Sequence, residues 1–87
     1  MTVEEARVAV RVNAIVQNVK RGSKGYVYSL SWVHLKGKDP YISVGVHDFE
    51  ANSVISENLL DLKIEDWNAP DYLVNDWISK ERERMKD

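Results

Sequence analysis

Apolar residues occupy every second position along the segment from residue 6 to residue 17. The apolar positions are Val8, Val10, Val12, Ala14 and Val16, and the polar positions between them are Arg7, Arg11, Asn13 and Gln17. A period of two places successive side chains on opposite faces of a β-strand. The segment is therefore predicted to be a strand with one buried face, and a strand of this kind requires a sheet around it.

Two further segments alternate in the same way. Residues 26–35 carry Tyr26, Tyr28, Leu30 and Trp32 on one face, and residues 41–49 carry Ile42, Val44 and Val46. The stretches before each of them, 20–25 and 36–40, are polar and contain glycine or proline, which is typical of hairpin loops. Three strands joined by short loops predict an antiparallel meander.

The parity of the residues predicts which face of the meander is buried, because a shift of one residue reverses every side chain. If the turn at 36–40 is centred on Lys38, the even-numbered residues of the second and third strands share one face, and if the first loop has an odd number of residues, those of the first strand join them. The predicted core is Val8, Val10, Val12, Val16, Tyr28, Leu30, Trp32, Ile42, Val44 and Val46. The predicted outer face is hydrophilic and comprises Arg7, Arg11, Asn13, Gln17, Ser29, Ser31, Ser43 and His47.

The C-terminal half predicts one more strand and a helix. Residues 48–58 fit either a short helix or a loop, whereas residues 60–65 alternate, with Leu60, Leu62 and Ile64 inward. Asn68 and Pro70 form a helix-start signal, and the apolar positions after them recur with helical spacing. The charged end, residues 80–87, is expected to fray or project. The predicted fold class is α+β: a four-stranded antiparallel sheet, a three-strand meander plus one strand, covered on one face by a C-terminal amphipathic helix.

Length and composition limit the organisation of the chain. Its 87 residues predict a single domain spanning 1–87, and the absence of cysteine excludes disulfides and thiolate metal sites. The first residues lack the pattern of a signal peptide, and no apolar run approaches the roughly 20 residues of a membrane span. These features predict a soluble, cytoplasmic protein with no membrane partner.

Charge is distributed unevenly between the two halves. Residues 1–47 have seven cations and three acids, a net charge of +4, whereas residues 48–87 have five cations and eleven acids, a net charge of −6. The halves either neutralise each other or present separate faces to partners. A nucleic-acid-binding module is the alternative functional hypothesis, with a phosphate-tracking surface formed by Arg7, Arg11, Lys20, Arg21, Lys24, Lys36 and Lys38.

Little in the sequence indicates catalysis, a metal or a cofactor. The two histidines, His34 and His47, have opposite parity on neighbouring strands and are predicted to face opposite ways. The stretch from Gly22 to Gly25 lacks the Gly-Lys-Ser/Thr ending of a phosphate loop, and no helix is predicted after it. Asp48 and Glu50 beside His47 are a common surface combination. The chain is predicted to be non-enzymatic and to need no cofactor.

A binding protein is the function that these observations favour. The predicted helix has an acidic outer side, and the candidate partner-binding residues there are Asp71, Tyr72, Asp76 and Glu83. Apolar surface near Tyr26, Trp67 and Met85 exceeds what one helix covers, and the sheet leaves two free edges. A homodimer, formed by edge pairing or helix packing, is therefore predicted in addition to a protein partner.

Residues 69–78, Ala-Pro-Asp-Tyr-Leu-Val-Asn-Asp-Trp-Ile, resemble the C-terminal segment of small uncharacterised proteins encoded by phages and prophages of Gram-positive bacteria. The resemblance implies no activity and no site residues. It implies a context, because small accessory proteins of mobile elements often bind and block a host protein.

Overall fold

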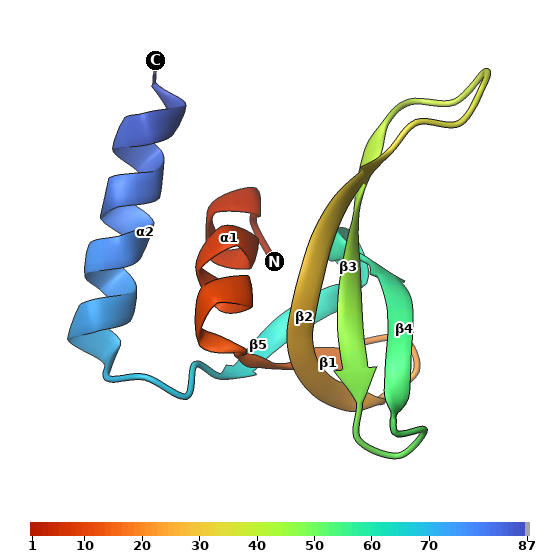
Figure 1. Ribbon diagram of the computed structural model, residues 1–87, viewed down its shortest axis with the longest axis horizontal. Coiled ribbons are helices and arrows are strands. Elements are labelled where there is room, and N and C mark those ends of the chain that lie inside the picture. The colour runs from red at the N-terminus through yellow and green to blue at the C-terminus, as the bar shows by residue number, and fades with distance from the viewer. Residues whose placement is uncertain (87) are drawn as a thin grey trace.

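The computed structural model describes residues 1–86 and combines two α-helices with one five-stranded antiparallel sheet (Figure 1). The elements are α1 (Val3–Val12), β1 (Ile15–Asn18), β2 (Lys24–Val33), β3 (Tyr41–Asp48), β4 (Ser53–Asn58), the 3-10 helix η1 (Leu59–Asp61), β5 (Leu62–Asp66) and α2 (Asp71–Met85). The sheet has the strand order β4-β3-β2-β1-β5, so β4 and β5 are its edges. The predicted α+β class, with an antiparallel sheet and a C-terminal helix, is confirmed. The sheet has one strand more than the four predicted. The additional strand is β4, which lies in residues 48–58, the segment expected to be a short helix or a loop.

The prediction of a strand over residues 6–17 is wrong, because most of this segment forms α1. Thr2 and Glu5 form a capping box, in which each side chain bonds the backbone N–H of the other residue. Ala6 and Ala9 are fully buried against the sheet, where their small side chains allow the helix to approach closely. Asn13 ends the helix in the left-handed conformation, and only Ile15–Asn18 forms a strand.

A β-bulge in β2 changes which residues face the core. Val27 pairs with Val46 and Ser29 pairs with Gly45, so Tyr28 has no partner residue on β3. Before the bulge the odd residue Val27 is buried, whereas after it the even residue Leu30 packs against the core. The prediction that even-numbered residues face inward along the whole strand is therefore wrong at Tyr28, which is exposed.

The other predicted core positions divide into three groups. Val8, Val16, Val44 and Val46 are buried as predicted, and Val10, Val12, Leu30 and Ile42 are half-buried and pack against the core. Trp32 and Leu60 were predicted to be inward but are exposed. Ser43 was predicted on the solvated face but is buried, with its hydroxyl bonded to that of Ser56 on β4.

Helix α2 packs on α1 and not on the sheet, so the prediction that the C-terminal helix covers the apolar face is wrong, and α1 covers that face instead (Figure 1). The predicted apolar side of α2 is correct, since Val74 is buried and Leu73, Trp77 and Ile78 are half-buried. The charged end was expected to fray or project: it does not fray, because α2 is regular to Met85, and residues 82–86 are exposed while Glu81 is buried. Asp87 lies outside the described residues.

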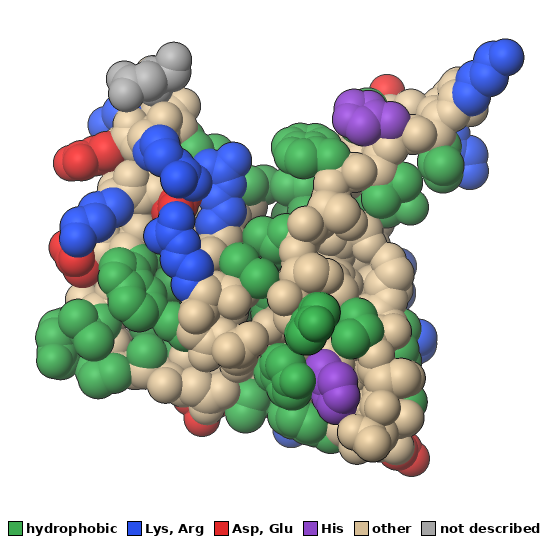
Figure 2. Space-filling view, viewed as in Figure 1, with side chains coloured by type: hydrophobic (Ala, Val, Ile, Leu, Met, Phe, Trp, Pro, Cys, Tyr) green, Lys and Arg blue, Asp and Glu red, His purple; other side chains and the backbone are tan. Residues whose placement is uncertain are grey.

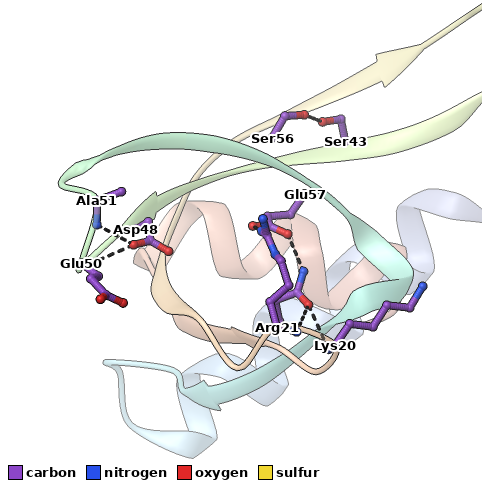
Figure 3. Close-up of polar contacts among 9 residues, drawn as sticks. Lys20, Arg21, Ser43, Asp48, Glu50, Ala51, Ser56 and Glu57 are labelled. Atoms are coloured by element: carbon purple, nitrogen blue, oxygen red, sulfur yellow. Dashed lines mark hydrogen bonds and ion pairs between the residues drawn. The ribbon is translucent and has the colours of Figure 1, made fainter.

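Buried polar side chains fix the loops at one end of the sheet (Figure 3). Asn18 Oδ1 accepts hydrogen bonds from the backbone N–H groups of Lys20 and Arg21, and Asn18 Nδ2 donates to the buried carboxylate of Glu57 on β4. Because β1 and β4 are separated by two strands in the sheet order, this bond shows that the sheet curls until these strands meet. Asp48 organises the β3–β4 turn in the same way by accepting from Glu50 and Ala51.

Candidate functional site

The hairpin formed by β2 and β3 extends beyond the rest of the sheet (Figure 1). Strand β4 pairs with residues 43–48 of β3 and β1 pairs with residues 24–26 of β2, so the far part of the hairpin has no neighbouring strand. We call residues 30–42 the hairpin arm. Its exposed apolar side chains are Trp32, Leu35 and Tyr41, and its loop carries Lys36 and Lys38.

Trp32 stands at the centre of the apolar surface of the hairpin arm and is 61% exposed. With Pro40, Tyr41 and the 80%-exposed Leu60 of η1 it lines a hollow of about 270 Å³. On its other side it lines a groove of about 170 Å³ against α1, which includes Val3 and Arg7. His34 lies beside it, with ring centroids 6.4 Å apart. An exposed tryptophan that borders two hollows is typical of an interaction site.

A second apolar region lies on the face of the sheet opposite the core, which we call the outer face. Ile15, Tyr26, His47 and Val54 pair in register across β1, β2, β3 and β4, and together they form one transverse row on this face. The rings of Tyr26 and His47 are stacked, with centroids 4.9 Å apart, and Phe49 lies beside Tyr26 at 6.3 Å. We call the depression of about 480 Å³ lined by Asn13, Ile15, Tyr26, Tyr28, Phe49 and Asn68 the aromatic hollow.

Three arginines surround the buried carboxylate of Glu81 where α1 and α2 meet. The nitrogen–oxygen distances are 2.6 Å to Arg11 and Arg84 and 3.3 Å to Arg7. Figure 2 shows this gathering of Lys and Arg side chains around acidic groups over the two helices. Burial raises the pKa of Glu81, but the hydrogen bond from Arg7 and the charges of Arg84 and Arg11 outweigh it and hold the pKa below its usual value.

The seven cations of the nucleic-acid hypothesis do not form one surface. Arg7 and Arg11 lie on α1 and pair with Glu81, while Lys20 pairs with Asp61 at 3.2 Å and Arg21 pairs with Glu57. The remaining three, Lys24, Lys36 and Lys38, form no ion pair within residues 1–86. Four of the seven cations thus pair with three acids of the second half, and Glu81 is shared between two of them.

The four predicted partner-binding residues are all exposed on α2. Tyr72, Asp76 and Glu83 lie along one line of the helix, opposite the buried Val74 and Glu81, and Asp71 lies at the first helical position. Asp76 is engaged in an ion pair with Lys80 at 3.0 Å. This surface is solvated and mostly polar, and Tyr72 is its large exposed side chain.

The two histidines lie apart, one on the hairpin arm and one on the outer face. Within residues 1–86 no three His, Asp or Glu side chains come close enough together to hold a metal ion. In the same part of the chain, neither helix combines the length and the apolar composition needed to cross a bilayer.

Comparison with known proteins found no matching family model, no similar curated protein and no similar solved structure. The function of the surfaces described above is therefore inferred from their geometry and chemistry.

Sequence reasoning missed the apolar surface of the hairpin arm, and of the aromatic hollow it predicted only uncovered apolar surface near Tyr26. Trp32 and Tyr28 were assigned to the core by parity, and Leu60 was placed inward on a strand that begins two residues later. The available signal was the length of the alternating pattern. The alternation in residues 26–35 continues beyond the part of the β2–β3 hairpin that β1 and β4 flank.

Proposed function

We propose that this protein acts by binding a protein partner, without catalysis of its own, and that the hairpin arm makes the central contact. The observation that carries the proposal is the exposed cluster of Trp32, Tyr41 and Leu60 around one hollow. Tryptophan and tyrosine contribute most of the binding energy in many protein interfaces, where they fill or form apolar pockets. A role as an accessory protein of a mobile element agrees with this mode of action.

The chemistry of the hairpin arm specifies the partner. The hollow is apolar, and the loop next to it carries Lys36 and Lys38, which have no acidic partner within the described residues. Figure 2 shows basic side chains at the tip of the arm and hydrophobic ones along it. The complementary surface is a projecting leucine or aromatic side chain with acidic residues a few ångströms away.

Replacing Trp32 with alanine should weaken the affinity for the partner about tenfold or more, because it removes the wall shared by both hollows. The partner is first recovered at stoichiometric amount from an extract of the native host with the full chain as bait. The affinity of the purified pair is then measured by calorimetry for the wild type, Trp32→Ala and Leu60→Ala. Because Trp32 and Leu60 are exposed, the thermal unfolding temperature of both variants should remain close to that of the wild type.

Tyr72→Ala provides the matched control, since Tyr72 is an equally exposed aromatic residue on α2. Full affinity in Trp32→Ala together with a loss in Tyr72→Ala would reject the hairpin arm and assign the contact to the acidic face of α2. Retention of nucleic acid that falls steeply with salt and is lost in Lys36→Glu/Lys38→Glu would instead support the nucleic-acid alternative.

We also propose that the protein forms a homodimer. The free edges of β4 and β5 support this proposal, because their unpaired backbone N–H and C=O groups can pair with a strand of a second copy. Sedimentation over micromolar concentrations should show a species of about twice 10.0 kDa. A 10.0 kDa species at every concentration would contradict it.

A further inference from the structure

We infer that the aromatic hollow binds a guanidinium group, presented by an arginine side chain of a protein partner. This inference rests on the proposed function only in that the arginine belongs to a protein. The hollow lies on the outer face, and its residues are distinct from those of the hairpin arm. It is therefore a second recognition site on the same chain.

The aromatic side chains of the hollow provide surfaces on which a planar cation stacks. Tyr26 is fixed by its stacking on His47, and Phe49 is inclined to it by 49°. Tyr28 lies two residues after Tyr26 on the same face of β2 and is exposed. Guanidinium groups stack on aromatic rings and are more weakly hydrated than ammonium groups, which favours arginine over lysine at such a position.

Two amide oxygens of the hollow are free to accept hydrogen bonds. Asn13 Nδ2 donates to the carbonyl of Val27, and Asn68 Nδ2 donates to the carbonyl of Asn13. Because both amide nitrogens are engaged, each side chain leaves its Oδ1 atom as an acceptor, and neither oxygen accepts a bond within residues 1–86. A group with several N–H donors satisfies these oxygens.

Asp66 adds negative charge at the margin of the hollow. It pairs with Ile15 across β1 and β5, and its Oδ1 atom accepts from the backbone N–H of Asn68, so it adjoins two residues that line the hollow. A carboxylate and two amide oxygens beside aromatic rings complement a flat cation with five donors. Lys24 lies on the same face two residues before Tyr26 and opposes cation binding from its side.

The test uses Nα-acetyl-arginine amide as the probe and the matching citrulline derivative as its neutral, nearly isosteric control. In titrations of the full chain followed by ¹H–¹⁵N NMR, the arginine probe should give saturable shifts in the millimolar range, centred on Asn13, Tyr28, Phe49 and Asn68. Citrulline should bind at least about fivefold more weakly.

Two variants at exposed positions test the roles of the ring and the charge. Phe49→Leu and Asp66→Asn should each weaken the arginine probe about threefold or more, Lys24→Gln should bind it at least as tightly as the wild type, and Asp76→Asn on α2 should not change it. Shifts that do not saturate, equal binding of citrulline, shifts centred outside the hollow, or unchanged affinity in both Phe49→Leu and Asp66→Asn would overturn the inference. Because no partner protein is present, this result is independent of the hairpin-arm experiment.

Discussion

Replacement of Gly25 with alanine should lower the free energy of unfolding by about 3 kcal/mol, the upper part of the range for a methyl group forced into a packed site. Gly25 is buried in β2, opposite Asp48 of β3 and Val16 of β1. A Cβ atom at this position would overlap the backbone carbonyl oxygen of His47 and lie 2.7 Å from Val46 Cγ1. The carbonyl oxygen belongs to the backbone of the neighbouring strand and cannot move aside without disrupting the sheet. Urea unfolding of wild type and Gly25→Ala measures the difference.

Gly22 provides the matched control. It lies in the β1–β2 loop at φ 75°, where an added Cβ meets no atom within 4 Å. Gly22→Ala should therefore cost only the strain of a left-handed alanine, about 1 kcal/mol. If Gly25→Ala were as stable as Gly22→Ala, the close approach of β2 and β3 at this position would be wrong.

Replacement of Glu81 with alanine should destabilise the fold by about 3 kcal/mol. The change leaves Arg7, Arg11 and Arg84 close together without the carboxylate that neutralises them, and it opens a gap between α1 and α2. The value lies at the low end of the range for breaking a buried ion pair, because the arginines keep partial access to water. Thermal unfolding of Glu81→Ala, with the exposed Glu83→Ala two residues away as the control, checks it. Equal stability of the two variants would contradict the role of Glu81 as a buried link.

The same carboxylate predicts how stability depends on pH. Its pKa is lower in the folded chain than in the unfolded chain, so the stability it contributes is fully present above the ordinary glutamate pKa of 4.5. That contribution is lost as the pH falls through the lower pKa of the folded state, where Glu81 takes up a proton. The wild type should therefore lose more stability on acidification below pH 4.5 than Glu81→Gln does. Parallel acid titrations of the two proteins, followed by circular dichroism, provide the measurement.

Strands β2 and β3 and the C-terminal helix were predictable because their signals are local. Residues 26–33 and 41–48 alternate, short polar loops with glycine or proline separate them, and Pro70 lies where a helix begins. The α1 segment carries two competing local signals. Its valines alternate as in a strand, but Thr-x-x-Glu at residues 2–5 is the sequence mark of a capping box, and two alanines lie at helical spacing three residues apart. Weighing that mark would have predicted the helix.

The remaining features depend on contacts that are distant in sequence. The bulge at Tyr28 has no glycine or proline at residues 27–29 of β2 to mark it, and it reverses which residues of β2 face the core after that point. Glu81 lies in a charged run that favours solvent, and its burial depends on Arg7, 74 residues earlier in the chain. The aromatic hollow depends on a distant contact as well, because the left-handed residues Asn13 and Asn68 meet across 55 positions.

The attachment of α2 to α1 has a consequence for the order in which the chain acquires its structure during synthesis. Helix α1 leaves the ribosome before any strand, yet the carboxylate that neutralises Arg7 and Arg11 is made after the whole sheet. Until Glu81 emerges, Arg7 and Arg11 lack the carboxylate that pairs with them in the finished protein, and residues 1–47 carry a net charge of +4. Translation of the sheet therefore proceeds on a chain that is more basic than the finished protein, and the ribosome, itself rich in phosphate, is the first surface that this temporary charge meets.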